Sequence, residues 1–286
     1  MVAPMIMVIG ATGRIGRAVI DHLLRAGVSV RAVTRRPAAA NLPAAVEVVP
    51  GDLTKPASLV ACLHGVDVVF LLWTAPDATL PVVISQIACH ATRIVALTSP
   101  HQVAHPFFEQ PNAMAALHAH LERLIAASGV EFTILRPGVF ASNCLAWWAP
   151  TIRDGDVVRW PYGAAETAPI DERDIAAVAA CALCEDGHNG AEYVLTGPHS
   201  LSQVEQVRII GQAIGRRLRF EEMPVEDFRR EMTRRAPGPW VDMLLGAWRA
   251  TLGHRALVTS TVAAVTGSPA RTFRHWAGDH VNAFLS

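Results

Sequence analysis

Short apolar runs alternate with amphipathic segments through the first half of the chain. The apolar runs are hydrophobic on both faces, which is typical of strands buried between two layers of helices. They span residues 4–9, 28–33, 46–49, 67–72, 93–97 and 130–135. Helical patterns follow at 17–26, 56–64, 79–90 and 112–128. Strands and helices that alternate at this spacing predict an α/β fold with a parallel sheet wound on both faces.

The regular alternation of strand and helix patterns ends after residue 143. The later pattern predicts helices at 145–153, 171–184, 202–214 and 225–235, an irregular strand pair at 156–162, and strands at 192–195 and 217–222. We therefore expect two parts: a nucleotide-binding sheet domain over 1–150, and a smaller α+β substrate-binding cap over 151–286. Segments of the cap are expected to pack back on the sheet.

The turn after the first strand carries glycines at positions 10, 13 and 16, and the helix that follows ends at Gly27. Gly10 allows a tight turn, Gly13 allows backbone to approach a pyrophosphate, and Gly16 allows helix and strand to pack closely. The N–H groups and positive dipole end of the helix then face the phosphates. Glycine triplets also occur in purely structural turns, but this strand–turn–helix context favours a dinucleotide site.

The second strand ends in Thr34-Arg35-Arg36-Pro37. A site specific for NAD usually places an acidic residue here, to accept a hydrogen bond from the ribose 2′-hydroxyl. Two guanidinium groups match a 2′-phosphate instead. The alternative is a pair of solvated loop arginines; we favour NADP(H), used as NADPH, as the cofactor.

Composition excludes several classes of partner. The 286 residues include 25 basic and 25 acidic side chains, so we expect neither a nucleic-acid nor an anionic-membrane partner. The first apolar run ends at Gly10 without a basic flank or a cleavage site, and no later run is long enough to span a bilayer. The expected protein is cytoplasmic, a monomer or a homodimer.

The five cysteines lie in apolar segments, at positions 62, 89, 144, 181 and 184. Cys181 and Cys184 have the spacing of a redox motif, but they fall inside a helical pattern and lack a second pair of metal ligands. We expect buried, reduced thiols and no metal.

An ordered set of motifs resembles the NmrA-like NAD(P)-binding group of atypical short-chain dehydrogenases/reductases, which includes bacterial quinone and azo-dye reductases. The motifs lie at 10–16, 34–37, 51–53, 97–99, 128–138, 143 and 168–176. The resemblance implies a Rossmann-like fold, with residues 51–53 against the adenine and the segments after strands four, five and six around the nicotinamide. Together with the glycine turn, it assigns cofactor contacts to Gly10, Thr12, Gly13, Arg14, Ile15, Arg35, Arg36, Asp52, Leu53, Leu72, Trp73, Thr74, Thr98, Pro137, Gly138 and Phe140.

The chain departs from the wider superfamily at the Tyr-x-x-x-Lys pair. Counting back from Glu122 puts His118 at the lysine position and Met114 at the tyrosine position. Lys55 is the only lysine in the chain, so the Tyr/Lys mechanism cannot operate.

His118 and Ser99 are the remaining catalytic candidates. Histidine titrates near neutral pH and can donate a proton, and Ser99 follows the fifth strand, where the superfamily often keeps a catalytic serine. The alternatives are a partly buried helix histidine and a hydroxyl bonded to nearby backbone. We expect His120 to be a surface residue, and Asp171 with Asp174 to cap a helix rather than act as an acid pair.

Aromatic residues gather on segments that lead to the carboxyl edge of the sheet. The residues expected around the substrate are Trp73, His101, Phe107, Phe140, Trp147 and Trp148. They favour an apolar, planar small-molecule substrate. The leading hypothesis is an NADPH-dependent oxidoreductase acting on a quinone, imine or conjugated carbonyl. An NADP(H)-sensing regulator and a non-redox cyclase or isomerase on the same fold stay open.

Overall fold

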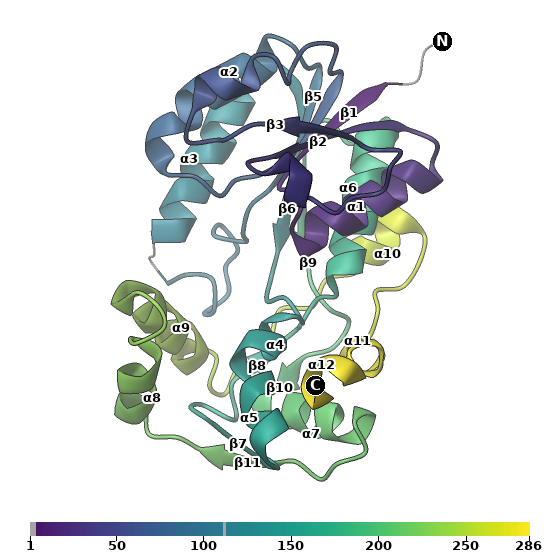
Figure 1. The fold of residues 1–286 in the computed structure, drawn as a ribbon. Helices are drawn as coiled ribbons and strands as arrows, with labels where there is room; N and C mark the ends of the chain where they lie inside the picture. Colours follow the sequence, from purple (N-terminus) through teal and green to yellow (C-terminus); the bar gives the residue numbers. More distant parts are fainter. Residues whose placement is uncertain (1–3, 111–112) are drawn as a thin grey trace.

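The computed structural model describes residues 4–110 and 113–286, and Figure 1 shows a sheet layer at one end and a smaller mixed region at the other. The sheet has seven parallel strands in the order β3-β2-β1-β4-β5-β6-β9. They are β1 (Met5–Ile9), β2 (Ser29–Thr34), β3 (Glu47–Pro50), β4 (Val68–Leu72), β5 (Arg93–Leu97), β6 (Glu131–Pro137) and β9 (Ala191–Leu195). The expected α/β, Rossmann-like architecture is confirmed.

Helices cover both faces of this sheet (Figure 1). α1 (Arg14–Arg25) and α6 (Glu172–Cys184) pack on one face, in a core with Ile6 and Val8 of β1. α2 (Leu80–Ala88) and α3 (Ala113–Ala127) cover the other, in a core with Met7 and Ile9. Alternate residues of a strand point to opposite faces, so burial on both sides explains the unbroken apolar runs.

The C-terminal region surrounds a third apolar core. Its elements are α4 (Asn143–Trp147), α5 (Ala149–Asp154), β7 (Val157–Trp160), β8 (Glu166–Thr167), β10 (Leu201–Ser202), α7 (Gln203–Ala213), β11 (Arg219–Glu222), α8 (Val225–Met232), α9 (Gly238–Ala250), α10 (Thr261–Thr266), α11 (Phe273–Asp279) and α12 (Val281–Leu285). α10 is the exception, since it packs beside α6 on the sheet layer. β9 and α6 also belong to that layer although they come from the second half of the chain.

Several local expectations were wrong. The segment 156–162 holds one strand, β7, which pairs in parallel with the distant β11. The expected helix at 145–153 is divided into α4 and α5 at Trp148, and the expected helix at 56–64 is reduced to a 3-10 helix, η2 (Pro56–Leu59). α9 to α12 were not predicted. The first residue of the expected helix at 112–128 lies outside the described residues.

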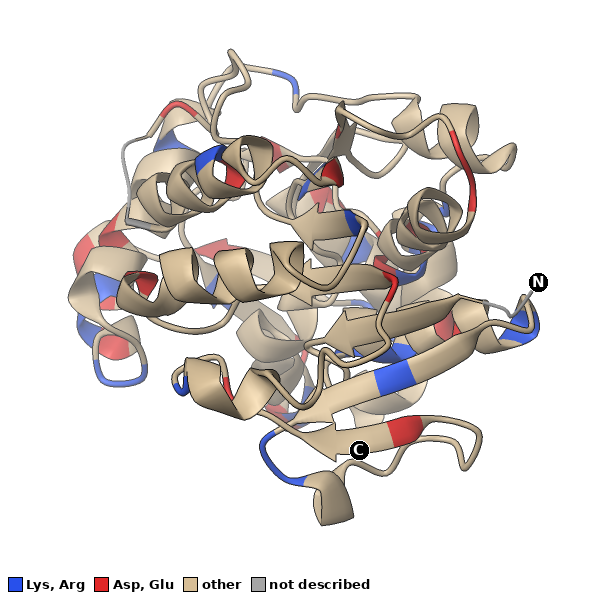
Figure 2. Ribbon diagram, turned by 90° about the horizontal axis from the view of Figure 1, so that it is seen from above, with Lys and Arg blue, Asp and Glu red and all other residues tan. Residues whose placement is uncertain are grey.

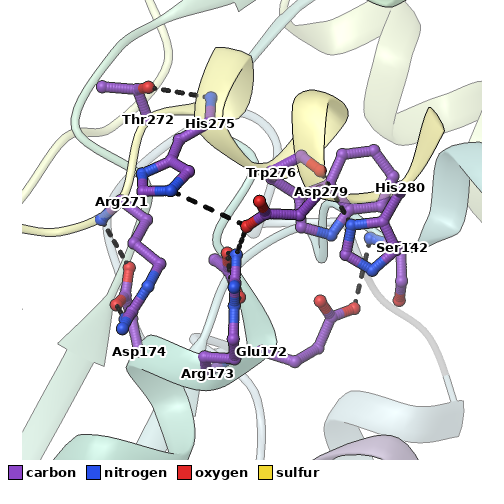
Figure 3. Close-up of polar contacts among 11 residues, drawn as sticks. Ser142, Glu172, Arg173, Asp174, Arg271, Thr272, His275, Trp276, Asp279 and His280 are labelled. Carbon is purple, nitrogen blue, oxygen red and sulfur yellow. Dashed lines mark hydrogen bonds and ion pairs between the residues drawn. The ribbon is translucent and has the colours of Figure 1, made fainter.

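Asp171 and Asp174 begin α6 and are structural, as expected. The Asp171 carboxylate caps the helix by accepting a hydrogen bond of 2.9 Å from the backbone N–H of Arg173. The Asp174 carboxylate accepts one of 2.7 Å from the backbone N–H of Arg271 and pairs with the guanidinium of the same residue (Figure 3). The segment before α11 is thereby fixed to the sheet layer.

Two further contacts of the first turn of α6 reach other parts of the C-terminal region. Arg173 pairs with Asp279 at the end of α11, 2.7 Å away, and Glu172 accepts a 3.1 Å hydrogen bond from the backbone N–H of Ser142 (Figure 3). Ser142 directly precedes α4. The start of α6 therefore joins three chain segments and fixes where α4 begins.

The cysteines only partly follow expectation. All five are free thiols, and Cys62 and Cys144 are buried. Cys89 and Cys184, however, are exposed, because each lies at the end of a helix, and Cys181 is half-buried.

Charges of both signs are distributed over many elements, as Figure 2 shows. Within 4–110 and 113–286, no helix has the length and apolar character needed to cross a membrane.

Candidate functional site

The loop between β1 and α1 is a tight glycine turn. Gly10 has a φ of +88°, which favours glycine, and its carbonyl accepts a 3.1 Å hydrogen bond from the N–H of Gly13. A Cβ atom on Gly16 would lie 2.2 Å from that same carbonyl oxygen. Helix and loop can approach this closely only because residue 16 has no side chain.

The N-terminus of α1 is open. Gly13 is its N-cap and provides no side-chain acceptor, and no acidic residue stands in the first turn. Thr12 and Arg14 are exposed beside it, whereas the Ile15 side chain is buried in the core. The first N–H groups and the positive end of the helix dipole are therefore available to an anion.

Arg17 holds this loop in place and was not anticipated from the sequence. Its Nε donates a 3.1 Å hydrogen bond to the carbonyl of Thr12. Its two terminal nitrogens donate to the carbonyls of Ala40 and Asn41, at 2.7 and 2.6 Å. The sequence around Arg17 does not predict its hydrogen bonds to Ala40 and Asn41, because these two residues lie 23 and 24 positions further along the chain.

The two arginines that follow β2 are exposed. Among the described residues, neither the Arg35 nor the Arg36 side chain makes a hydrogen bond or ion pair within the protein. Asp52, after β3, carries a carboxylate held by the N–H and hydroxyl of Thr54 at 2.9 and 2.8 Å, and these hydrogen bonds lower its pKa. Leu53 beside it is buried.

These features fit a phosphorylated dinucleotide. The helix N–H groups behind the glycine turn are open to an anion, and Arg14, Arg35 and Arg36 are exposed positive charges that follow the neighbouring strands β1 and β2, with Arg35 close enough to Asp52 to act on its carboxylate electrostatically. The described residues contain no group of three or more His, Cys, Asp or Glu side chains placed to hold a metal.

A cavity of about 390 Å³ opens at the carboxyl ends of β4, β5 and β6. Its described lining residues are Leu72, Trp73, Leu97, Thr98, Ser99, Pro100, His101, Phe107, Phe108, Gln110, Met114, Ala115, His118, Pro137, Gly138, Val139, Phe140, Asn143, Trp147, Trp240, Met243, Leu244 and Ala247. None of them is Lys, Arg, Asp or Glu. Ligands of open α/β sheets bind at this edge.

The loop after β4 and the loop after β6 each contribute as the sequence suggested. Leu72 and Trp73 line the cavity, and the Trp73 indole N–H is held by the carbonyl of Ala75 at 2.6 Å. Thr74 is exposed and lies outside the lining. Pro137, Gly138 and Phe140, at and after the end of β6, also line the cavity.

Trp147 and Trp148 were both expected at the substrate, but only Trp147 lines the cavity. Trp148 is fully buried in the C-terminal core behind it, with ring centroids 6.2 Å apart. Trp147 is also packed edge-on against Trp248 at 5.4 Å and tilted against Trp160 at 6.0 Å. Consecutive residues of a helix point about 100° apart, so the two side chains take different environments.

One wall of the cavity was missed altogether. α9 presents Trp240, Met243, Leu244 and Ala247 to it. These positions follow the i, i+3, i+4, i+7 spacing of a helix face, which the sequence did contain.

Ser99 and His118 form the polar centre of the cavity. The Nδ1 atom of His118 is hydrogen-bonded to the Ser99 Oγ at 2.7 Å. Burial, with a smaller effect of His101, lowers the pKa of His118 from 6.5 to about 4, against the opposing effect of Glu122. The sequence suggested a histidine whose pKa suits proton donation near neutrality, whereas the lowered pKa favours a neutral ring at that pH; a catalytic role of His118 stays a prediction.

A buried ion pair lies behind this centre. Arg136 of β6 donates from Nη2 and Nε to the Glu122 carboxylate, at 2.7 and 3.1 Å, and both side chains are under a tenth exposed. The Thr98 hydroxyl donates to the same carboxylate at 2.6 Å. Thr98 thus contributes its side chain to the scaffold of the site.

His120 faces away from this centre. Its ring lies 2.6 Å from the carboxylate of Asp77 in a partly exposed pair, consistent with the expected surface position.

Comparison with protein families assigns residues 10–186 to an NAD(P)H-binding family. The match covers most of the chain and begins at Gly10, the first residue of the glycine turn. The chain belongs to this NAD(P)H-binding, NmrA-like family of atypical short-chain dehydrogenases/reductases. It is an NAD(P)H-dependent oxidoreductase, as expected from the sequence.

Full-length relatives support the assignment. The chain is 39% identical over 285 residues to (4-alkanoyl-5-oxo-2,5-dihydrofuran-3-yl)methyl phosphate reductase of Streptomyces griseus, covering 98% of this chain and 99% of the relative. It is 34% identical over 293 residues to the NAD(P)H azoreductase of Xenophilus azovorans, with the same coverage of 98% and 99%. The structure of an NADPH-dependent quinone oxidoreductase from Escherichia coli superposes with a TM-score of 0.79 at 25% identity, over 96% of this chain and 98% of that one.

Met114 and His118, the positions at which the resemblance led us to expect tyrosine and lysine, both lie on α3. Both residues line the cavity. Ser99 and His118 are the polar groups that the fold brings together there.

Proposed function

We propose that this protein is an NADPH-dependent reductase of neutral, apolar, planar acceptors such as quinones, imines or conjugated carbonyls. The observation that carries the proposal is the lining of the cavity at the carboxyl edge of the sheet: it is largely aromatic and aliphatic, and its described residues include no charged Lys, Arg, Asp or Glu. A planar apolar molecule gains from burial against such walls, whereas a charged one would lose its hydration without compensation.

The glycine turn and the open start of α1 would hold the pyrophosphate of the cofactor, and Arg35 with Arg36 would hold a 2′-phosphate. Asp52 and Leu53 would lie at the adenine, and the segments after β4, β5 and β6 would enclose the nicotinamide. When bound, NADPH would supply the hydride; the protein supplies position and a hydrogen-bond donor, and the proton that completes the reduction comes from water.

Ser99 and His118 would provide that hydrogen-bond donor at the cavity wall. A neutral imidazole carries one N–H, and the serine hydroxyl carries one O–H, so the hydrogen-bonded pair has a donor to present to an acceptor that is becoming negative. His118 would thus act as a neutral hydrogen-bond donor. No tyrosine is needed for this role.

The relatives support the proposed reaction class, reduction by NAD(P)H, and suggest which kinds of acceptor to consider. Their names describe reduction of a furanone-type phosphate ester, of azo compounds and of quinones. A phosphate group requires guanidinium or ammonium partners, or a cluster of N–H groups, to offset its desolvation. Because the described lining lacks cationic side chains, we infer a preference for the uncharged acceptors among these classes.

The test is NADPH consumption by the purified protein, followed by absorbance, with matched pairs of acceptors. Each pair is a bicyclic quinone and the same ring carrying a phosphate or sulfonate group. We expect turnover of the neutral member and a much higher KM for the anionic one. Binding of NADPH without oxidation by any quinone, imine or enone would refute the proposed reaction, and a preference for the anionic member would refute the proposed acceptor class.

A further inference from the structure

The ring of His105 is hydrogen-bonded through both of its nitrogens. Nδ1 accepts a 3.2 Å hydrogen bond from the backbone N–H of Phe107, and Nε2 lies 2.9 Å from the carbonyl oxygen of Arg255. An amide N–H can only donate and a carbonyl can only accept, so both contacts require the same neutral ring, with its hydrogen on Nε2. Within the described part of the chain, neither the Phe107 N–H nor the Arg255 carbonyl has another hydrogen-bond partner.

The contact with Arg255 is the only hydrogen bond that joins residues 102–109 to a distant part of the described chain. Every other hydrogen bond of these residues has its partner within 100–110, such as the one from the N–H of Phe108 to the carbonyl of His105 at 2.8 Å. Backbone that is held only by local turns keeps much of its conformational freedom. A single hydrogen bond to a distant segment therefore has a large effect on where this loop lies.

The segment that contains Arg255 is itself anchored. Residues 251–260 lead from α9, which lines the cavity, to α10, which packs beside α6 on the sheet layer (Figure 1). The Ala256 N–H donates a 2.7 Å hydrogen bond to the Ser200 hydroxyl, and the Thr259 hydroxyl donates one of 2.9 Å to a carbonyl of β9. The His105 ring is therefore bonded to a segment that other contacts already hold in place.

The loop that His105 holds carries two aromatic residues of the cavity wall. Phe107 and Phe108 both line the cavity, and their rings meet edge-on with centroids 5.1 Å apart. The tip of the Phe108 ring lies 3.6 Å from the position that a Cβ atom on Gly138 would take, so it reaches the loop after β6. The His105 ring lies beside Phe108, with centroids 5.8 Å apart. The place of these two phenyl rings thus depends on where the histidine is held.

We propose that His105 is a positioning residue of the acceptor site: its hydrogen bond to the Arg255 carbonyl holds Phe107 and Phe108 in place as a wall for the acceptor. This rests on the proposed reductase function, in which a planar acceptor binds in the cavity. A wall that is fixed before binding adds no ordering cost, whereas a loose loop must be ordered at the expense of affinity. His105 therefore acts on the affinity for the acceptor rather than on the reduction step.

Two substitutions separate the two hydrogen bonds of the ring. The side-chain nitrogen of glutamine is as many bonds from Cα as Nε2 of histidine, so His105→Gln can still donate to the Arg255 carbonyl. The side-chain oxygen of asparagine matches Nδ1 in the same way, so His105→Asn can accept from the Phe107 N–H but cannot reach Arg255. His105→Leu removes both contacts. The matched control is His254→Leu, at an exposed histidine of the anchored segment whose ring makes no hydrogen bond among the described residues.

The first measurement on each variant is steady-state reduction of a neutral bicyclic quinone at saturating NADPH, together with NADPH affinity. We expect His105→Leu and His105→Asn to raise KM about fivefold, the order of one net hydrogen bond, with kcat within about twofold and NADPH affinity unchanged. His105→Gln and His254→Leu should stay close to the parent. A variant that merely destabilises the fold would lower kcat through a smaller folded fraction and leave KM unchanged.

The second measurement is amide hydrogen exchange of residues 102–110 and 251–260, which needs no turnover. Exchange should become faster in His105→Leu and His105→Asn, and stay near the parent rate in His105→Gln apart from the Phe107 amide itself. Parent-like KM and exchange in His105→Leu would overturn the proposal. So would parent-like behaviour of His105→Asn together with a raised KM in His105→Gln, because the ring would then act only within its own turn. If the variants show the expected exchange but the parent reduces no acceptor, the reductase function is refuted and the role of His105 in holding the loop is supported.

Discussion

The carbonyl oxygen of Gly10 and the α-carbon of Gly16 are so close that a Cβ atom on residue 16 would lie 2.2 Å from that oxygen. The nearest atoms are backbone, so no side-chain rotation can relieve the contact. We predict that Gly16→Ala lowers the free energy of unfolding by about 2 kcal/mol, because overpacking outweighs the gain of about 1 kcal/mol that alanine brings to a helix interior. Chemical denaturation measures this change.

Gly13→Ala is the matched control for that prediction. A Cβ atom on Gly13 would lie 3.4 Å from the Gly10 oxygen, close to ordinary contact, and the φ of −76° suits alanine. Stability should fall by less than about 1 kcal/mol, the cost of alanine at an N-cap. NADPH affinity should nevertheless decrease, since the new methyl group would occupy the approach to the helix N–H groups. If Gly13→Ala binds NADPH as tightly as the parent, the pyrophosphate does not lie against this loop.

Arg35→Asp tests the choice of cofactor. We expect a loss of about 1.5–3 kcal/mol in NADPH binding, the range of charge-assisted hydrogen bonds, and little change for NADH. Calorimetric titration of both nucleotides measures it. Arg25→Asp makes the same charge reversal at an exposed position at the end of α1. It controls for the long-range electrostatic effect of the changed net charge on nucleotide binding. An equal loss for NADPH and NADH would contradict a contact between Arg35 and the 2′-phosphate.

The sheet was predictable because its signal is local and strong. A strand such as 93–97 is apolar on both faces and ends in polar residues, so its bounds follow from the sequence alone. β7 and β11 were harder: their paired residues, such as Val157 and Arg219, are 62 positions apart (219 − 157), and each strand has only four residues, so no local pattern shows that they are neighbours.

In the candidate site, too, features with a local sequence signal were predictable, and features that depend on distant parts of the chain were not. Ser99 and His118 were placed by their position after β5 and on α3, and the fold does bring them together. Burial, which decides that His118 is neutral, depends on residues from several elements and is not visible in the sequence around position 118. The sequence also could not decide between Trp147 and Trp148: their side chains point about 100° apart, and which of them faces the cavity depends on how α4 packs against the C-terminal core.

Trp147→Ala tests the cavity wall. The ring is fixed by its three tryptophan neighbours, so it offers a preorganised face to a planar acceptor. We predict that KM for a bicyclic quinone rises about tenfold, while NADPH affinity stays within about twofold, as lost aromatic contact is worth about 1 kcal/mol or more. Trp147→Phe keeps part of the packing and should be intermediate. If KM is unchanged in a folded Trp147→Ala variant, the acceptor does not contact this wall.

The lowered pKa of His118 makes stability depend on pH in a defined window. The pKa falls from 6.5 in the unfolded chain to about 4 in the folded protein, so the unfolded chain binds the proton more tightly. Above pH 6.5 the ring is neutral in both the folded and the unfolded state, so it makes stability independent of pH there. As the pH falls from 6.5 toward 4, only the unfolded chain takes up the proton, and the free energy of unfolding decreases by about 3 kcal/mol in total. Urea unfolding of the parent at pH 7 and at pH 4 measures the loss, and His118→Leu removes this contribution while it leaves the other titrating groups in place. Between pH 7 and pH 4 the parent should therefore lose about 3 kcal/mol more stability than His118→Leu; an identical pH dependence in parent and variant would show that His118 is not buried as a neutral ring.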